Sequence, residues 1–200
     1  AHPLLMPVRT AAGVITVPAG VTSFTVTVPT TADTIDEADE TYTLAIGAAS
    51  ATGTIVDDDG APSIATVTSD TQLEGLSLVH TVTLSNTSSS ATTFAYSLGG
   101  GTATGGGTDY STPPSFSNGV TLVGTNLIVP AGVSSFTTAV PTTLDTIEEL
   151  DETYNLSVGG IAAVGTITDD DAAPTITAAS SPTVAEGTDL VYAVTLSNAS

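Results

Sequence analysis

Asp145-Thr-Ile-Glu-Glu-Leu-Asp-Glu152 runs directly into Thr-Tyr-Asn-Leu-Ser-Val at residues 153–158. Five of the first eight residues are carboxylates, and a run this acidic stays disordered unless a folded scaffold holds it. In the second part, Tyr154, Leu156 and Val158 alternate with polar residues, which is the pattern of a strand with one buried face. Together the two parts predict an acidic loop mounted on a β-scaffold.

The chain repeats itself with a fixed spacing. Val-Pro-Ala-Gly-Val-Thr-Ser-Phe at residues 17–24 returns as Val-Pro-Ala-Gly-Val-Ser-Ser-Phe at 129–136, a shift of 129 − 17 = 112 residues. Gly-Thr-Ile-x-Asp-Asp-Asp at 53–59 returns at 165–171 with the same shift. A unit of this length is a domain rather than a short solenoid repeat. We therefore predict the C-terminal part of one copy in residues 1–59 (with 1–13 unmatched), a complete copy in 60–171 and the start of a third in 172–200.

Alternation with a period of two recurs through the complete copy. It predicts about seven strands, at residues 63–67, 76–85, 91–98, within 120–129, and at 134–140, 153–158 and 164–168. No stretch has the periodicity of a helix. Seven short strands separated by Gly, Pro, Asn and Ser turns indicate an all-β, immunoglobulin-like antiparallel Greek-key sandwich, repeated in tandem. The predicted core comprises Leu78, Val82, Phe94, Tyr96, Phe136, Tyr154 and Leu156.

Composition excludes several classes of function. The net charge is −20, with 21 acids and a single Lys or Arg, so neither nucleic acid nor an anionic membrane surface is expected as a partner. There is no cysteine for disulfides or thiolate chemistry, and no apolar run long enough for membrane insertion. With only His2 and His80 available as histidine bases and the acids clustered in loops, we do not expect an enzyme.

The acids of the complete copy fall in few places. If consecutive strands alternate in direction, four connections meet at one pole, and these carry Glu74, Asp109, residues 145–152 and residues 169–171. Residues 60–171 contain no Lys or Arg to compensate them. Several hard oxygen ligands from different loops are the ligand set that Ca²⁺ prefers. A solvated acidic surface is the alternative, and the convergence of four segments favours a metal site.

These motifs, in this order, resemble the Calx-beta family of calcium-binding domains. The resemblance rests on Glu-Gly before a strand, Gly-Thr-Ala-Thr at 101–104 with Gly-Thr-Asp-Tyr at 107–110, Val-Pro-Ala-Gly, Asp-x-x-x-Glu-x-Asp-Glu-Thr-Tyr and Gly-Thr-Ile-x-Asp-Asp-Asp. It covers nearly the whole complete copy. It implies a sandwich that binds several Ca²⁺ ions at one end. The implied ligands are the carboxylates of Glu74, Asp109, Asp145, Glu149, Glu152, Asp169, Asp170 and Asp171 and the carbonyl of Ile147, with Asp33, Glu37, Glu40, Asp57, Asp58, Asp59 and Glu186 as counterparts in the flanking copies. The family often has an acid before the Asp145 position, where this chain has Leu144, and this implies fewer or weaker ions.

Abundant Thr, Ser, Gly and Ala with almost no Lys or Arg is similar to the branch of the family found in large bacterial surface adhesins. The resemblance implies a calcium-stabilised extender that projects an adhesive region from the cell surface, with neighbouring copies of the same chain as its partners. A calcium-sensing or ligand-binding module, or a filament subunit built by strand complementation with other copies, are the alternatives. The implied location is extracellular, on a bacterial cell surface.

Two further features have structural interpretations. The glycine-rich stretch at residues 99–107 lacks the Lys of a phosphate-binding loop, so we expect a flexible connection between strands. His80 lies on the apolar phase of its strand, and we expect it at the margin of the core.

Overall fold

The computed structural model describes residues 9–11 and 13–199, and every regular element in them is a strand. No helix among them is long and apolar enough to cross a membrane. By its contacts the chain divides into two units, Ala1–Asp33 and Thr34–Ser200. In the first, β1 (Arg9–Ala11) and β2 (Val14–Thr16) form an antiparallel hairpin, and the described residues after β2 form no strand.

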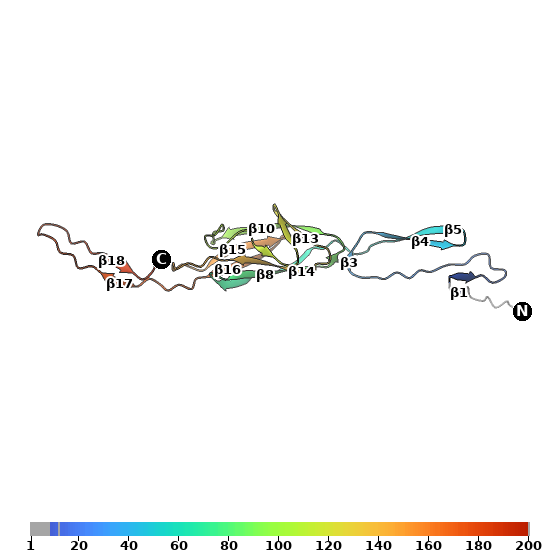
Figure 1. Cartoon of the computed structure of the whole chain (residues 1–200), viewed down its shortest axis with the longest axis horizontal. Helices are drawn as coiled ribbons and strands as arrows, with labels where there is room; N and C mark the ends of the chain where they lie inside the picture. The colour runs from blue at the N-terminus through green and yellow to red at the C-terminus, as the bar shows by residue number, and fades with distance from the viewer. Residues whose placement is uncertain (1–8, 12, 200) are drawn as a thin grey trace. The chain divides into compact units, whose positions relative to one another are not determined.

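Within the second unit, ten strands form a two-sheet sandwich (Figure 1). The six-stranded sheet has the order β12-β13-β10-β15-β16-β7 and the four-stranded sheet the order β11-β14-β8-β6. Their bounds are β6 (Ile64–Val67), β7 (Asp70–Leu73), β8 (Ser77–Leu84), β10 (Thr92–Gly101), β11 (Ser115–Phe116), β12 (Thr121–Val123), β13 (Asn126–Val129), β14 (Ser135–Pro141), β15 (Glu152–Val158) and β16 (Ile161–Thr168). The predicted all-β, immunoglobulin-like sandwich is confirmed.

The number of strands and one pairing differ from the prediction. The strand expected within residues 120–129 is a hairpin of β12 and β13, and the short β11 precedes it. The first predicted strand is followed by a second piece, β7, which runs parallel to β16 in the opposite sheet. The chain switches sheets between β6 and β7, so the first sheet gains a parallel edge strand that an alternating pattern does not predict.

The core is apolar at one end of the sandwich and partly polar at the other. Five of the seven predicted core residues are fully or almost fully buried, while Phe94 and Tyr96 are half-buried and pack against them. His80 is wrongly predicted at the margin, because it is 0% exposed. Its Nδ1 lies 2.7 Å from the carbonyl oxygen of Thr68 and its Nε2 lies 2.8 Å from the Tyr154 hydroxyl, so both ring nitrogens are satisfied inside the core.

The glycine-rich stretch is not simply a flexible connection. Its first three glycines belong to β10, which pairs with β15 through a register shift between Gly99 and Gly101. At Gly101, with φ of +123°, an added Cβ would lie 2.4 Å from the carbonyl oxygen of Thr153. Only glycine allows the two strands to approach this closely.

The flanking segments of the second unit contain two hairpins that match parts of the sandwich. β4 (Glu40–Ile46) pairs with β5 (Ala49–Ile55) in the register in which β15 pairs with β16, shifted by 112 residues. β17 (Ile176–Ala179) pairs with β18 (Val194–Leu196) as β6 pairs with the end of β8. The sequence repeat is therefore accompanied by a repeat in local pairing.

Candidate metal centre

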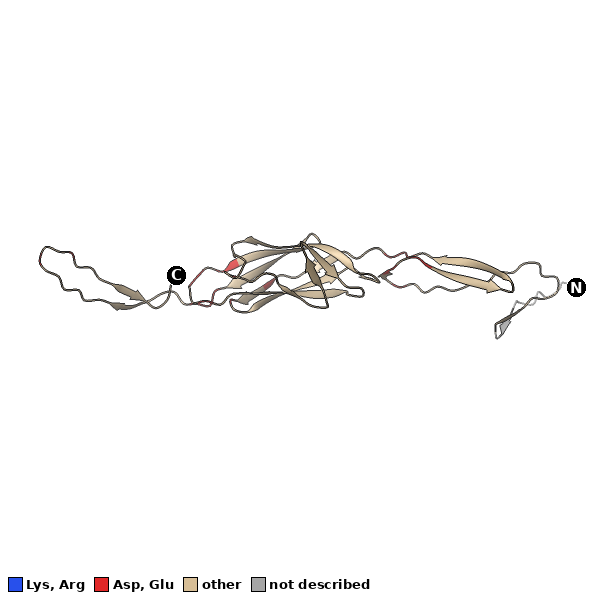
Figure 2. Ribbon diagram, turned by 45° about the horizontal axis from the view of Figure 1, so that its top comes forward, with Lys and Arg blue, Asp and Glu red and all other residues tan. Residues whose placement is uncertain are grey.

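Two groups of three carboxylates lie at one pole of the sandwich. In each group, one oxygen from every residue lies within 4.8 Å of the others. The first group is Glu74, Asp145 and Asp171, and the second is Asp109, Glu149 and Glu152. Figure 2, with Asp and Glu in red, shows acidic positions in the loops at this end of the sandwich.

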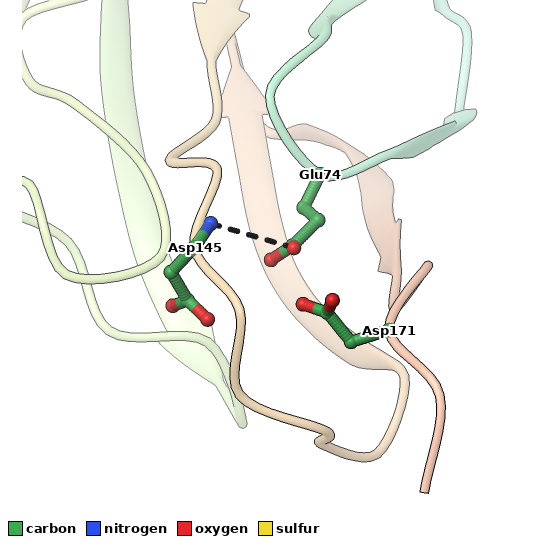
Figure 3. Close-up of side chains that lie close together, drawn as sticks. All are labelled: Glu74, Asp145 and Asp171. Atoms are coloured by element: carbon green, nitrogen blue, oxygen red, sulfur yellow. Dashed lines mark hydrogen bonds between the residues drawn. The ribbon is translucent and has the colours of Figure 1, made fainter. Parts of the chain in front are cut away.

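The parallel pairing of β7 with β16 positions Glu74. Leu73 is in register with Thr168, and the Glu74 amide donates to the Thr168 carbonyl at 3.0 Å. Glu74 therefore lies beside the acids that follow β16, and its side chain is only 8% exposed. Its Oε1 accepts a long 3.4 Å hydrogen bond from the Asp145 amide (Figure 3).

Gly75 lets the chain turn immediately after Glu74. Its φ is +76°, and an added Cβ would lie 2.9 Å from the Leu144 Cβ. Leu144, 64% exposed, thus lies against the backbone of this turn at the position where the resemblance implies an acid. The Glu-Gly pair is needed for geometry as well as charge.

The second group is held by a loop with its own hydrogen bonds. The Asp109 amide donates to the Thr104 carbonyl at 3.0 Å, and the Thr104 amide donates back to Asp109 Oδ2. The Asp109 carbonyl accepts from the Thr143 amide at 2.9 Å, which ties this loop to the end of β14. The ring of Tyr110, the next residue, packs against the ring of Tyr154, with 4.9 Å between the two ring centroids. Tyr110 is buried and anchors the loop in the core.

The two groups share one hollow. Carboxylates of both line it, and Asp169 joins them; the acidic lining is Glu74, Asp109, Asp145, Glu149, Glu152 and Asp169. The Asp169 amide donates a hydrogen bond to Asp151 Oδ1 at 3.4 Å. Asp170 lies close enough to raise the pKa of Glu74 by its charge. Acids from all four of these segments therefore lie near one another at this pole.

Burial and mutual repulsion raise the pKa of several of these carboxyls. Burial raises the pKa of Glu152 to about 7, and the hydrogen bond and charge of Asp109 and the charge of Glu149 add to the effect. Burial and the neighbouring acids also raise the pKa values of Glu74, Glu149 and Asp171. Without a cation this pole holds its negative charge at a cost in free energy.

Asp171 shows this most directly. Its Oδ2 is shielded from solvent and has no hydrogen-bond partner among the described residues. A carboxylate oxygen in this situation is a strong cation ligand, because no hydrogen bond to that oxygen compensates its desolvation. In the close-up the Asp171 carboxylate points toward Glu74 and Asp145 (Figure 3).

The remaining predicted ligands are less well grouped. Ile147 donates its amide to Asp145 Oδ1 at 2.8 Å, so it forms the turn that follows Asp145. The acids predicted as counterparts in the flanking copies belong to neither of the two groups found among the described residues: Asp33, Glu37, Glu40, Asp57, Asp58, Asp59 and Glu186. In one of these segments, Asp57 Oδ2 accepts from the Glu37 amide at 3.1 Å.

Two hydroxyl residues were not anticipated at the site. Thr108 and Thr143 line the shared hollow beside the carboxylates. Thr143 donates its hydroxyl to the Gly107 carbonyl at 3.1 Å, so it stabilises the loop that carries Asp109. Sequence gives little signal for such a role, because threonine is common throughout this chain.

Searches of protein-family models and of curated proteins find no match to this chain. Several solved structures are similar to it, among them two that are named as calcium-binding or CBD12 domains. The calcium binding domain CBD12 of CALX1.1 is 18% identical, with a TM-score of 0.42 over 56% of this chain and 45% of that chain. CBD12 from CALX1.2 is 20% identical, with a TM-score of 0.41 over 58% of this chain and 48% of that chain. The chain thus spans just under half the length of either.

Proposed function

We propose that the pole of the sandwich binds Ca²⁺ and that the ions stabilise the loops that carry the ligands. The observation that carries this proposal is the pair of three-carboxylate groups, five of whose six members line one hollow. The single Arg or Lys of the sequence, Arg9, lies in the other unit, and no Lys or Arg occurs in residues 34–200. The charge therefore calls for an external cation.

The ligand set favours calcium over other metals. Carboxylate oxygens are hard ligands. The sequence contains no cysteine, and the buried His80 is engaged with Thr68 and Tyr154. Six acids from different loops can supply the six to eight oxygens that Ca²⁺ takes. Mg²⁺ demands a stricter octahedral geometry and keeps its waters, which suits a crowded carboxylate hollow less well.

We further propose that the module acts as a structural extender. The support is the sequence repeat, the repeated hairpin registers, and the position of Asp171 directly before the Ala172-Ala-Pro174 linker. Ions bound by Asp171 would stiffen the exit from one copy toward the next. The composition fits a spacer on the outside of a bacterial cell, where calcium is abundant, that holds an adhesive region away from the surface.

A calcium titration of two neighbouring variants tests the metal site. Glu149 belongs to the second carboxylate group, whereas the adjacent Glu148 does not. By calorimetry on the full chain, Glu149→Gln should weaken calcium binding by about tenfold or remove a binding step. Glu148→Gln should leave the isotherm near that of the unsubstituted chain. Equal effects of both substitutions, or no calcium binding at all, would contradict the assigned site.

Small-angle scattering in calcium and in chelator tests the extender. We expect a longer maximum dimension and a higher melting temperature in calcium. If calcium binds but both quantities stay constant, the metal site stands and the extender role fails.

A further inference from the structure

We propose that residues 86–89, between β8 and β10, form a docking corner for the acidic loop of the preceding copy. The partner that fits this surface is another copy of the same repeat. The docking works through hydrogen bonds between protein groups and needs no metal, so the inference goes beyond the proposed calcium site.

The corner is occupied in the structure. β3 (Ile35–Asp36) pairs in parallel with β9 (Thr87–Ser88), with Ile35 opposite Thr87 and Asp36 opposite Ser88. The Ser88 hydroxyl donates to Asp36 Oδ2 at 2.7 Å, and the Ser89 amide donates to the Asp36 carbonyl at 2.9 Å. Ser88 is only 4% exposed, so these are shielded contacts rather than loose surface ones.

The same corner also holds the linker between the two copies. Asn86 Nδ2 donates to the Gly60 carbonyl at 2.8 Å, and Asn86 Oδ1 accepts from the Ser85 hydroxyl at 2.7 Å. The Ser85 hydroxyl oxygen in turn accepts from the Ser63 amide at 3.0 Å. Linker and acidic loop are therefore bound side by side on adjacent residues, which restricts the joint at two points.

The next joint along the chain shows the same arrangement 112 residues later. Ile147 forms a parallel bridge with Ala199, and the Glu148 amide donates to the Ala199 carbonyl at 3.1 Å. Asn198 Nδ2 donates to the Ala172 carbonyl at 2.7 Å, as Asn86 does to Gly60. Ser200, the counterpart of Ser88, lies outside the described residues. Two occurrences of one arrangement indicate a joint built into the repeat.

The two docking surfaces lie at different places on each copy. The loop that docks connects β14 to β15 in the complete copy, and the corner that receives it connects β8 to β10. A contact between two different surfaces can repeat from copy to copy without closing on itself. An array of any number of copies can therefore use this one joint.

Asp36 acts here as a hydrogen-bond acceptor. Its carboxylate oxygen and its carbonyl both accept from the corner, and it is not among the predicted metal ligands. An Asn at position 36 keeps a side-chain acceptor oxygen but has no charge. An Ala at this position has neither the side-chain oxygen nor the charge, and both variants keep the backbone carbonyl. The two substitutions therefore separate docking from electrostatic effects.

Amide hydrogen exchange on the full chain, in chelator, tests the docking. Ser88→Ala and Asp36→Ala should each speed exchange of the Ser89 amide about tenfold, the effect of losing roughly one hydrogen bond. Ser89→Ala, which removes only an exposed hydroxyl, and Asp36→Asn should leave it unchanged. The Gly132 amide donates to the Ser88 carbonyl, a bond between residues of the same copy, and should stay protected in all variants.

Three outcomes would overturn the docking corner. The first is equal exchange of the residue-89 amide in the Ser88→Ala and Ser89→Ala proteins. The second is exchange of this amide as fast in the Asp36→Asn protein as in the Asp36→Ala protein. The third is loss of protection at the Gly132 amide together with the residue-89 amide. Because the measurement is made without calcium, a chain that fails to bind calcium still gives a valid result.

Discussion

Replacing Glu74 by Gln should change stability in opposite directions with and without calcium. Glu74 is 8% exposed and one of its oxygens lies within 4.8 Å of a carboxylate oxygen of Asp145. Two unit charges at this distance repel by about 1 kcal/mol at the permittivity of water and by about 3 kcal/mol at an effective value of 20. Because the Asp145 side chain is only half-buried, we take the lower figure. The neutral variant should therefore be more stable in chelator by about 1 kcal/mol, or roughly 4 °C in melting temperature.

In calcium the sign reverses, because the variant loses a ligand. At a hundredfold excess over the dissociation constant, calcium stabilises by about 2.7 kcal/mol. A tenfold weaker site at the same concentration retains roughly half of this, so the calcium contribution is smaller by about 1.3 kcal/mol. This loss outweighs the gain of about 1 kcal/mol expected in chelator and leaves Glu74→Gln less stable than the parent by about 0.3 kcal/mol in calcium. Thermal melts of the full chain in both buffers give the two differences.

Glu186 supplies the matched control. It has the same Glu-Gly context one repeat later, but it is exposed and belongs to neither carboxylate group. Glu186→Gln should change stability little in either buffer. A Glu74→Gln protein that is destabilised in chelator, or that gains as much stability from calcium as the parent does, would refute the reasoning, since either result assigns Glu74 a role unrelated to cation binding.

Two further predictions concern pH and backbone. The pKa of Glu152 is about 7 in the folded protein against 4.5 in the unfolded reference. The contribution of Glu152 to stability is therefore complete below pH 4.5 and is lost as the pH rises through 7. Melts of metal-free protein should show stability falling over this pH range, and a rise in stability would contradict the prediction. Gly75→Ala should destabilise the protein more than Gly106→Ala in urea unfolding. Both glycines have positive φ, which costs an Ala roughly 1–2 kcal/mol at either position. Only at Gly75 would the added Cβ also meet the Leu144 side chain. Equal losses would show that the Leu144 contact is unimportant.

The sequence predicted the strands best where alternation was long. β8, β14 and β15 lie where the pattern of apolar and polar residues placed them, because a buried face forces a period of two. The segment Asp70–Leu73 has no such pattern, and its parallel pairing with β16 depends on a strand about 95 residues away. Local patterns do not report such partners.

The site was predictable to the level of loops and no further. Alternating strand directions brought the acidic connections to one pole, as expected. The division into two groups of three depends on side-chain distances, which neither spacing nor charge specifies. The burial of His80 shows the same limit, because its partner Tyr154 lies 74 residues away on the opposite sheet.

One short loop connects the candidate metal site to the joint with the following copy. Asp145 belongs to a carboxylate group, and its Oδ1 accepts from the Ile147 amide at 2.8 Å. The next residue, Glu148, donates its amide to the carbonyl of Ala199, in the segment that we propose to be the following copy. Because each residue has only two soft backbone dihedrals, fixing Asp145 and its turn leaves few conformations for Glu148. An ion held by Asp145 would therefore restrict the same loop that docks, so that protein hydrogen bonds select the contact and calcium limits its movement.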